Sequence, residues 1–221
     1  MRSLLKTPLT VLLSFAIGVA PSLAAPANPA TAPLGVVVQS DQAKLGGDAV
    51  SNGATIYDGD LLQTDVAGLL RANLNGLQLY LRQSTQAKVH RLANGFSANL
   101  DSGTLIISSK QGQAFELLAD GAVVRPAGAD PVVALVTRVS DKQLLLSSSR
   151  GALKVTLGAE VKTVEPGESY RLEFEADAAE PGSQVGPVGT ARARPKWVLI
   201  GALSLLAGVG AYYALISEDR L

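Results

Sequence analysis

The 221-residue chain contains no cysteine, one methionine, one tryptophan and one histidine. Without cysteine it can form neither disulfides nor thiolate metal sites, and it has no thiol nucleophile. The single histidine, His90, lies in the basic stretch 88–91, where we expect a solvated position. No nucleophile-elbow, phosphate-binding or zinc-protease motif occurs. We therefore expect no enzymatic activity, with a carboxylate-only hydrolase as the alternative.

The charge of the central region excludes another class of function. Residues 25–190 carry 13 Lys and Arg against 17 Asp and Glu, a net charge of −4. A nucleic-acid partner would require a basic stripe, so none is expected. Acidic residues are concentrated in residues 160–180, and such a run is expected to form a solvated face.

The N-terminus has the pattern of an export signal. Arg2 and Lys6 precede Leu9–Val19, an uncharged apolar run that is short for a membrane-spanning helix and is followed by small residues. This pattern predicts a signal peptide over residues 1–24 and a disordered leader over residues 25–33. An uncleaved signal anchor is the alternative, and either one exports the following region.

A second apolar stretch lies near the C-terminus. Residues 197–216 form 20 consecutive positions without charge, enough for a helix to cross about 30 Å of hydrocarbon. Trp197 stands at one edge and Tyr212 and Tyr213 near the other, as interfacial aromatic residues do. We predict a transmembrane helix over 197–216 that serves as the membrane anchor, with a short tail over 217–221.

The segment before this helix sets the expected arrangement. Residues 176–196 are rich in Ala, Pro and Gly, which predicts a flexible linker that lets the domain stand off the membrane. We expect a single-pass protein of the bacterial inner membrane with its domain in the periplasm, although three basic residues before the helix oppose the positive-inside bias. Small residues on the helix also allow homo-oligomerisation; they are Ala207, Gly208, Gly210 and Ala211.

Residues 34–175 have the pattern of an all-β domain. Residues 77–81 alternate strictly between apolar and polar positions, and Asn75–Gly76 before them is a typical hairpin turn. No helical period extends over a dozen residues. We predict a single small domain of many short strands, either a β-sandwich or a solenoid-like roll. The expected strands are 69–74, 77–81, 86–89, 96–100, 104–108, 114–118, 121–125, 132–139, 143–148, 152–157, 161–164 and 169–174.

Residues 57–81 resemble the FecR-type periplasmic domain. The family pattern reads roughly Gly-Asp-x-Leu-x-Thr, then Gly, alternating apolar residues, a Gly turn and another strand. Weaker matches extend the resemblance over about residues 34–175. The matching positions, for which we expect a structural role, are Gly59, Asp60, Leu62, Thr64, Gly68, Leu70, Ala72, Leu74, Gly76, Leu79 and Leu81.

The resemblance implies an extracytoplasmic, non-catalytic module that binds an envelope or membrane protein in signalling or assembly. Members of this family include regulators of iron uptake that carry a cytoplasmic anti-sigma domain before a membrane helix. The sequence before residue 25 offers no such domain, so control of a sigma factor would require a separate membrane partner. A module that binds cell-wall or surface glycan is the alternative, and it would require an exposed aromatic platform.

Three carboxylates lie close together in this motif. Asp58, Asp60 and Asp65 could contribute oxygen ligands to Ca²⁺, but their spacing matches no EF-hand loop. Asp-Gly is also ordinary turn chemistry, because the carboxylate accepts backbone N–H bonds. We therefore treat the three as weak metal candidates and expect neither a metal nor a cofactor.

Overall fold

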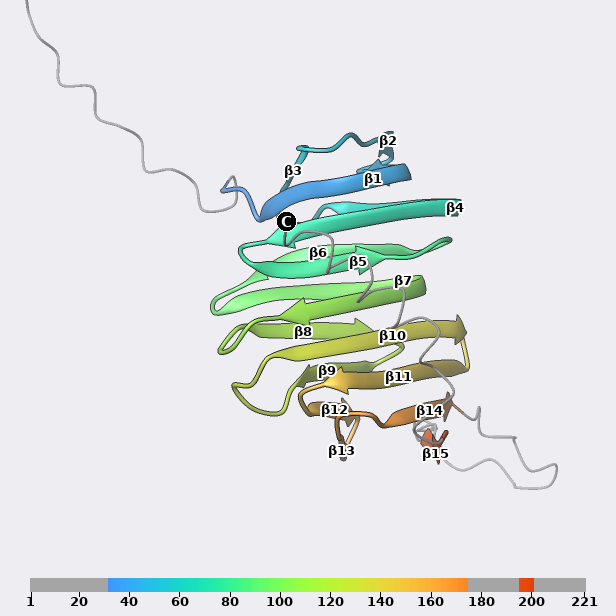
Figure 1. Cartoon of the computed structure of the whole chain (residues 1–221). Helices are drawn as coiled ribbons and strands as arrows, with labels where there is room; N and C mark the ends of the chain where they lie inside the picture. The colour runs from blue at the N-terminus through green and yellow to red at the C-terminus, as the bar shows by residue number, and fades with distance from the viewer. Residues whose placement is uncertain (1–31, 175–194, 201–221) are drawn as a thin grey trace, which may run out of the picture.

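The computed structural model describes residues 32–174 and 195–200, which form one continuous sheet of 15 strands (Figure 1). All-β architecture with many short strands is as predicted. The strands are β1 (Gly35–Leu45), β2 (Asp48–Ala49), β3 (Thr55–Ile56), β4 (Leu61–Leu74), β5 (Leu77–Leu81), β6 (Gln86–Leu92), β7 (Gly95–Ser109), β8 (Ala114–Ala119), β9 (Ala122–Pro126), β10 (Val132–Ser140), β11 (Gln143–Arg150), β12 (Leu153–Leu157), β13 (Glu160–Val164), β14 (Ser169–Phe174) and β15 (Pro195–Leu199).

The sheet divides into two branches at the long strands β4 and β7. The first part of each strand pairs with β6, and the second part pairs with β5. Beyond β7, one branch continues through β8, β9, β12 and β13, and the other through β10, β11, β14 and β15. The branches lie one behind the other, so the sheet is bent into a two-layer roll (Figure 1). Only the pairing of β7 with β8 is parallel among the described strands.

The main core lies between the two layers because the strands alternate apolar and polar residues. In β5, Leu77, Leu79 and Leu81 are at most 2% exposed, whereas Gln78 between them faces solvent. Strands of the back layer follow the same pattern, as Leu117 on β8 shows. Period-two patterning therefore determines which face of each strand is buried.

A smaller apolar cluster lies on the opposite face of the front layer. Ile106 on β7 stands between Tyr80 on β5 and Leu135 on β10, in direct cross-strand register. Ile106, Leu135 and the nearby Val133 are less than a tenth exposed, and the half-buried Tyr80 packs against them. Strand β10 is thus apolar on both faces, which explains its unbroken apolar sequence.

Threonine hydroxyls join the strands where the two layers separate. Thr85 donates its backbone N–H to the Thr64 hydroxyl at 3.0 Å, and the Thr85 hydroxyl accepts the Thr104 N–H at 2.9 Å. The Thr104 hydroxyl lies 3.0 Å from that of Thr137 on β10. These side chains supply bonds at the place where the bent strands can no longer pair with each other.

The C-terminal part differs from the prediction. Residues 195–199 form β15, an antiparallel partner of β14, so the first residues of the predicted membrane helix and the last of the predicted linker belong to the sheet. The parts of the chain that the structure describes include no helix long and apolar enough to cross a membrane. The predicted signal peptide and most of the leader, residues 175–194, and residues 201–221 with Tyr212 and Tyr213 lie outside the described residues.

Candidate functional site

The turn between β3 and β4 contains the Gly-Asp pair of the motif. Gly59 has a φ of +86°, which a side chain would strain, and its N–H donates to the Val89 carbonyl at 2.8 Å. The Asp60 carboxylate accepts the backbone N–H of Tyr57 at 2.7 Å, and the Asp60 carbonyl accepts the Val89 N–H at 3.0 Å. Both motif residues therefore hold the turn together and attach it to β6.

The three candidate calcium ligands each have a different partner. Asp58 accepts the backbone N–H of Arg91 at 2.8 Å, and this bond holds the pKa of the Asp58 carboxyl below its ordinary value. Asp60 bonds within its turn, and Asp65 pairs with Lys44 at 3.2 Å. Among the described residues, no three metal-ligating side chains form a group that could hold an ion. Turn and ion-pair chemistry accounts for all three carboxylates.

Possible bases and nucleophiles are bonded in structural roles. His90 Nδ1 lies 3.4 Å from the Asp58 carboxylate, and its side chain is 45% exposed, so it occupies the solvated position expected for it. The buried Ser148 hydroxyl donates to carbonyl groups of the turn that follows β11. The hydroxyl of Ser169 bonds that of Ser147 at 3.0 Å. None of these contacts aligns a base with a nucleophile.

The remaining motif residues occupy buried or closely packed positions. Leu62 is fully buried, and Thr64, 6% exposed, bonds the loop between β5 and β6. A Cβ on Gly68 would lie 2.5 Å from a backbone oxygen of β1. Gly76 and Asn75 have φ values of +91° and +51°, which are typical of a tight hairpin turn. The structure thus places the motif in the framework of the domain.

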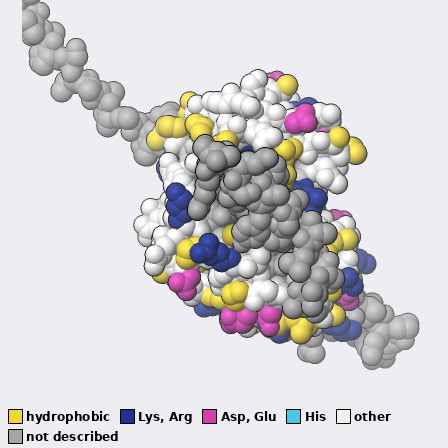
Figure 2. All heavy atoms as spheres, viewed as in Figure 1, with side chains coloured by type: hydrophobic (Ala, Val, Ile, Leu, Met, Phe, Trp, Pro, Cys, Tyr) yellow, Lys and Arg dark blue, Asp and Glu magenta, His cyan; other side chains and the backbone are white. Residues whose placement is uncertain are grey.

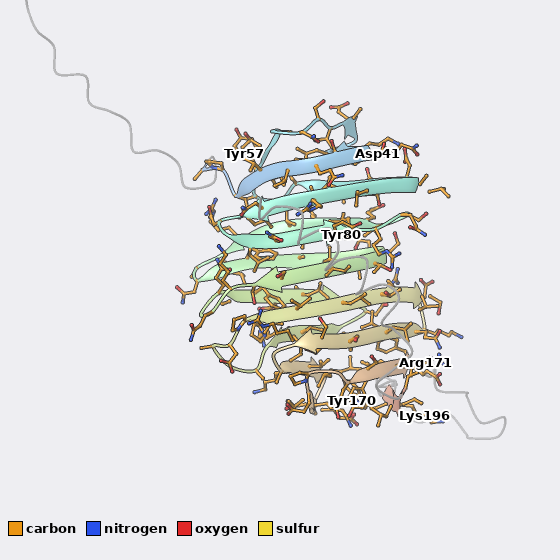
Figure 3. All side chains as sticks on the ribbon, viewed as in Figure 1. Asp41, Tyr57, Tyr80, Tyr170, Arg171 and Lys196 are labelled. Carbon is orange, nitrogen blue, oxygen red and sulfur yellow. The ribbon has the colours of Figure 1, made fainter. Side chains whose placement is uncertain are left out.

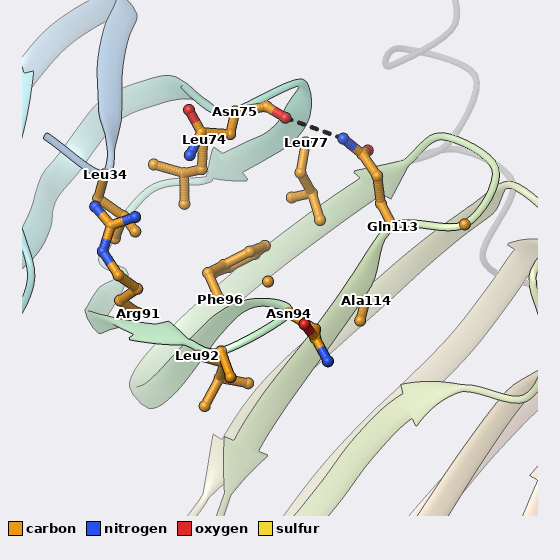
Figure 4. A pocket seen from close by; sticks show the side chains of 13 residues that line it. Leu34, Leu74, Asn75, Leu77, Arg91, Leu92, Asn94, Phe96, Gln113 and Ala114 are labelled. Atoms are coloured by element: carbon orange, nitrogen blue, oxygen red, sulfur yellow. Dashed lines mark hydrogen bonds between the residues drawn. The ribbon is translucent and has the colours of Figure 1, made fainter.

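A pocket of about 360 Å³ opens where three turns meet at one end of the strands (Figure 4). Its volume lies at the lower end of the range for small-molecule sites. The lining combines apolar side chains with polar ones at the sides; the apolar residues are Leu34, Leu74, Leu77, Leu92 and Phe96, and the polar ones are Asn75, Arg91, Asn94 and Gln113.

Hydrogen bonds fix two of the polar side chains around this pocket. Gln113 donates Nε2 to the Asn75 carbonyl at 3.0 Å and accepts the Lys110 N–H at 2.9 Å (Figure 4). Arg91 donates Nη2 to the carbonyl groups of Ala32 and Pro33. The Nε of Arg91 is buried and has no hydrogen-bond partner among the described residues. The side chains of Gln113 and Arg91 are therefore held in place at the pocket wall.

Most aromatic side chains of the domain serve the core. Phe96, Phe115 and Tyr170 are at most 8% exposed, and Tyr80 is half-buried. Tyr57 is the aromatic side chain with more than a third of its surface exposed, within the described residues. Figure 3 shows Tyr57 and Tyr170 at opposite ends of the roll. The described aromatic residues therefore form no platform of the kind that the glycan-binding alternative requires.

The final strands of the two branches meet at the lower end of the roll. Trp197 on β15 donates its indole N–H to Glu160 on β13 at 3.0 Å, and its ring stands edge-on to Tyr170. Lys162 on β13 lies 4.5 Å from the centre of the Tyr170 ring. Burial is the main cause that raises the pKa of Tyr170, and the neighbouring Glu168 adds to it. Trp197 is thus a contact of the domain, which corrects its assignment to a membrane helix.

Comparison with solved structures supports the fold prediction. Two crystal structures of a "putative anti-sigma factor" from Parabacteroides distasonis ATCC 8503, at 1.65 and 2.50 Å resolution, match with a TM-score of 0.50 and 13% identity. The match covers 67% of this chain and 64% and 63% of those chains. The fold is shared. At this identity the likeness concerns the fold alone, and this chain spans less than two thirds of the length of the structures it matches.

Comparison of the sequence with family models and with curated proteins found no match. The resemblance to the FecR-type domain therefore remains a prediction from the motif, and the shared fold is compatible with it. The pocket residues were not predicted, because they come together from turns that are distant in the sequence. One signal was available: Asn94–Gly95 is another Asn-Gly pair, and Asn94 lies in the turn between β6 and β7.

Proposed function

We propose that this chain is a membrane-tethered, extracytoplasmic module of the FecR type that binds an envelope protein in signalling or assembly and has no catalytic role. The fold shared with the anti-sigma factor structures is the observation that carries this proposal. Two features of the sequence agree with it, namely the export signal at the N-terminus and the apolar segment near the C-terminus.

The pocket between the turns is the place where we expect the partner to bind. Its apolar wall at Leu77 and Phe96 suits an apolar side chain, and the polar groups of Asn94 and Gln113 suit the peptide backbone that carries it. A protein partner would therefore insert a short apolar segment here.

Site-specific photocrosslinking in intact cells tests this proposal. A photoreactive side chain at Asn94, which is exposed and lines the pocket, should give one adduct of defined mass that contains an envelope protein. The control is the same side chain at Val66, which is 83% exposed and lies in the bend of β4, away from the pocket lining. Adducts of equal yield at both positions, or none at either, would contradict the proposal.

Binding measured with the identified partner supplies the quantitative test. Asn94→Trp should fill the mouth of the pocket and weaken binding at least tenfold, and Val66→Trp should leave it unchanged. Equal affinities for the two variants would place the interface elsewhere.

A further inference from the structure

The last described residues, 195–200, are hydrogen-bonded to the sheet, and the rest of the apolar segment, residues 201–216, follows them directly. Leu199 on β15 pairs with Tyr170 on β14, and the Ile200 N–H donates to the Ser169 carbonyl at 2.9 Å. Residues 175–194 therefore connect two neighbouring strands of one sheet, and they do not separate the domain from the apolar segment. Any membrane helix that follows Ile200 begins at the edge of the domain.

The length of that segment limits how far the domain can stand from the bilayer. Residues 201–216 number 16, and as a helix they would span about 24 Å, because each residue adds about 1.5 Å. The hydrocarbon core is about 30 Å thick. A helix of this length is shorter than the hydrocarbon core, so it can span the core only where the bilayer thins locally, and its two ends then lie at the hydrocarbon boundaries. The edge formed by β15 would then be drawn to the membrane surface.

The chemistry of this end agrees with contact to lipid. Val198 and Leu199 on β15 are 43% and 58% exposed, and Val161 on β13 is 57% exposed. Trp197 stands beside them, and Lys162 has its ammonium group over the neighbouring aromatic rings. Exposed apolar side chains with tryptophan and lysine are the residues that occupy a membrane–water interface.

The charged side chains at this end of the roll do not form a basic patch that would favour anionic lipids. Glu160, Glu165 and Glu168 lie around the groove between β13 and Trp197, together with Lys162. Figure 2 shows acidic and apolar side chains next to each other at the lower end of the molecule. Attraction would therefore come from the apolar and aromatic groups, and zwitterionic lipid suffices.

We propose that the end of the roll formed by β13 and β15 lies against the bilayer surface, with Val198 and Leu199 at the hydrocarbon boundary. This inference rests on the membrane tether of the proposed function. The domain would then have a fixed orientation at the membrane instead of standing off it on a flexible linker. The β13–β15 end would be a lipid-binding surface.

Tryptophan fluorescence tests the inference directly, because Trp197 is the single tryptophan of the chain. The full chain is reconstituted in phosphatidylcholine vesicles, with and without bromine on the acyl chains close to the headgroups. Bromine at this depth should quench Trp197 at least twofold. The control variant carries a twelve-residue Gly/Ser insertion after Ile200, which keeps β15 and the apolar segment but lets the domain leave the surface; quenching should then disappear.

A second variant provides an independent test in case the chain with the insertion does not fold. Leu199→Asp changes a side chain that is 58% exposed, so it should preserve the strand signal in circular dichroism while reducing the quenching. Vesicle flotation is measured first on each sample. If the chain does not float with the vesicles, the membrane tether itself fails and the inference fails with it. If it floats but Trp197 is not quenched, or is quenched equally in all variants, the tether stands and the inference is overturned.

Discussion

The guanidinium of Arg138 on β10 binds the carboxylate of Asp120 in the turn between β8 and β9, at 2.7 to 2.8 Å. The two side chains are 24% and 15% exposed, and Arg138 also donates to the Asp101 carbonyl. Hydrogen bonding to Asp120 is the main cause that raises the pKa of Arg138 above its ordinary value. Because β10 and the β8–β9 turn belong to different branches, this pair joins the two layers of the roll.

Replacing Arg138 should therefore weaken the contact between the layers. In Arg138→Met, Asp120 keeps a mostly buried charge without its partner, and we expect the free energy of unfolding to fall by about 2–3 kcal/mol. Urea unfolding of the full chain in mild detergent, followed by circular dichroism, measures this loss. The matched control is Arg125→Met, because Arg125 pairs with Glu116 at 3.0 Å but is 51% exposed. Arg125→Met should lower the free energy of unfolding by less than about 0.5 kcal/mol. Equal decreases for the two variants would contradict the role assigned to Arg138.

The threonine of the motif should be sensitive to loss of its hydroxyl. Thr64→Val keeps the shape of the side chain but leaves the buried Thr85 N–H without its acceptor and the Arg82 carbonyl without the hydroxyl donor. We expect the free energy of unfolding to fall by about 1–3 kcal/mol. Thr163→Val on the exposed side of β13 is the control and should change stability little. The same urea titration compares the two, and an unchanged midpoint for Thr64→Val would show that these bonds contribute nothing.

The close approach of two strands at Gly68 predicts a steric effect. A Cβ at this position would lie 2.5 Å from the Gln42 carbonyl oxygen and 2.7 Å from the Asp65 nitrogen, both in the backbone. Gly68→Ala should therefore force β1 and β4 apart and lower the melting temperature by several degrees, which corresponds to about 1–3 kcal/mol. Gly128→Ala is the control, because a Cβ there meets nothing within 4 Å. Equal melting temperatures for the two variants would refute the steric explanation.

The Asp58 carboxylate predicts a dependence of stability on pH. The Arg91 N–H lowers the pKa of Asp58 in the folded protein, so the ionised form stabilises the fold above the ordinary value of about 3.9. This contribution should be lost as the pH falls through the pKa that Asp58 has in the folded protein. Carbon-13 NMR of the carboxyl should give a titration midpoint below that of an unfolded peptide, and Asp58→Asn should remove this part of the acid destabilisation. A midpoint at or above 3.9 would contradict it.

Local patterning was sufficient to predict most of the strands. From Leu77 to Phe174 most elements were expected within a few residues, because apolar alternation and Gly or Asn turns are encoded by neighbours in the sequence. The two strands expected at 96–100 and 104–108 are one continuous strand, β7. Strand β1 was not predicted, since irregular pairing at Val37–Gln39 and Asp41–Ala43 interrupts its alternation. Residues 197–199 were assigned to a membrane helix because their apolar run continues into the following segment, and residues 195–196 were assigned to the linker before it.

Contacts between distant residues were beyond the reach of the sequence pattern. Local alternation specifies which face of a strand is apolar, and so the sequence by itself determined an all-β domain with a buried side to each strand. It could not specify that β4 and β7 bend into both layers, that Arg91, Asn94 and Gln113 surround one pocket, or that Trp197 reaches Glu160. The tertiary structure decided these, because pairing partners depend on how the whole sheet closes and are not written in any short segment.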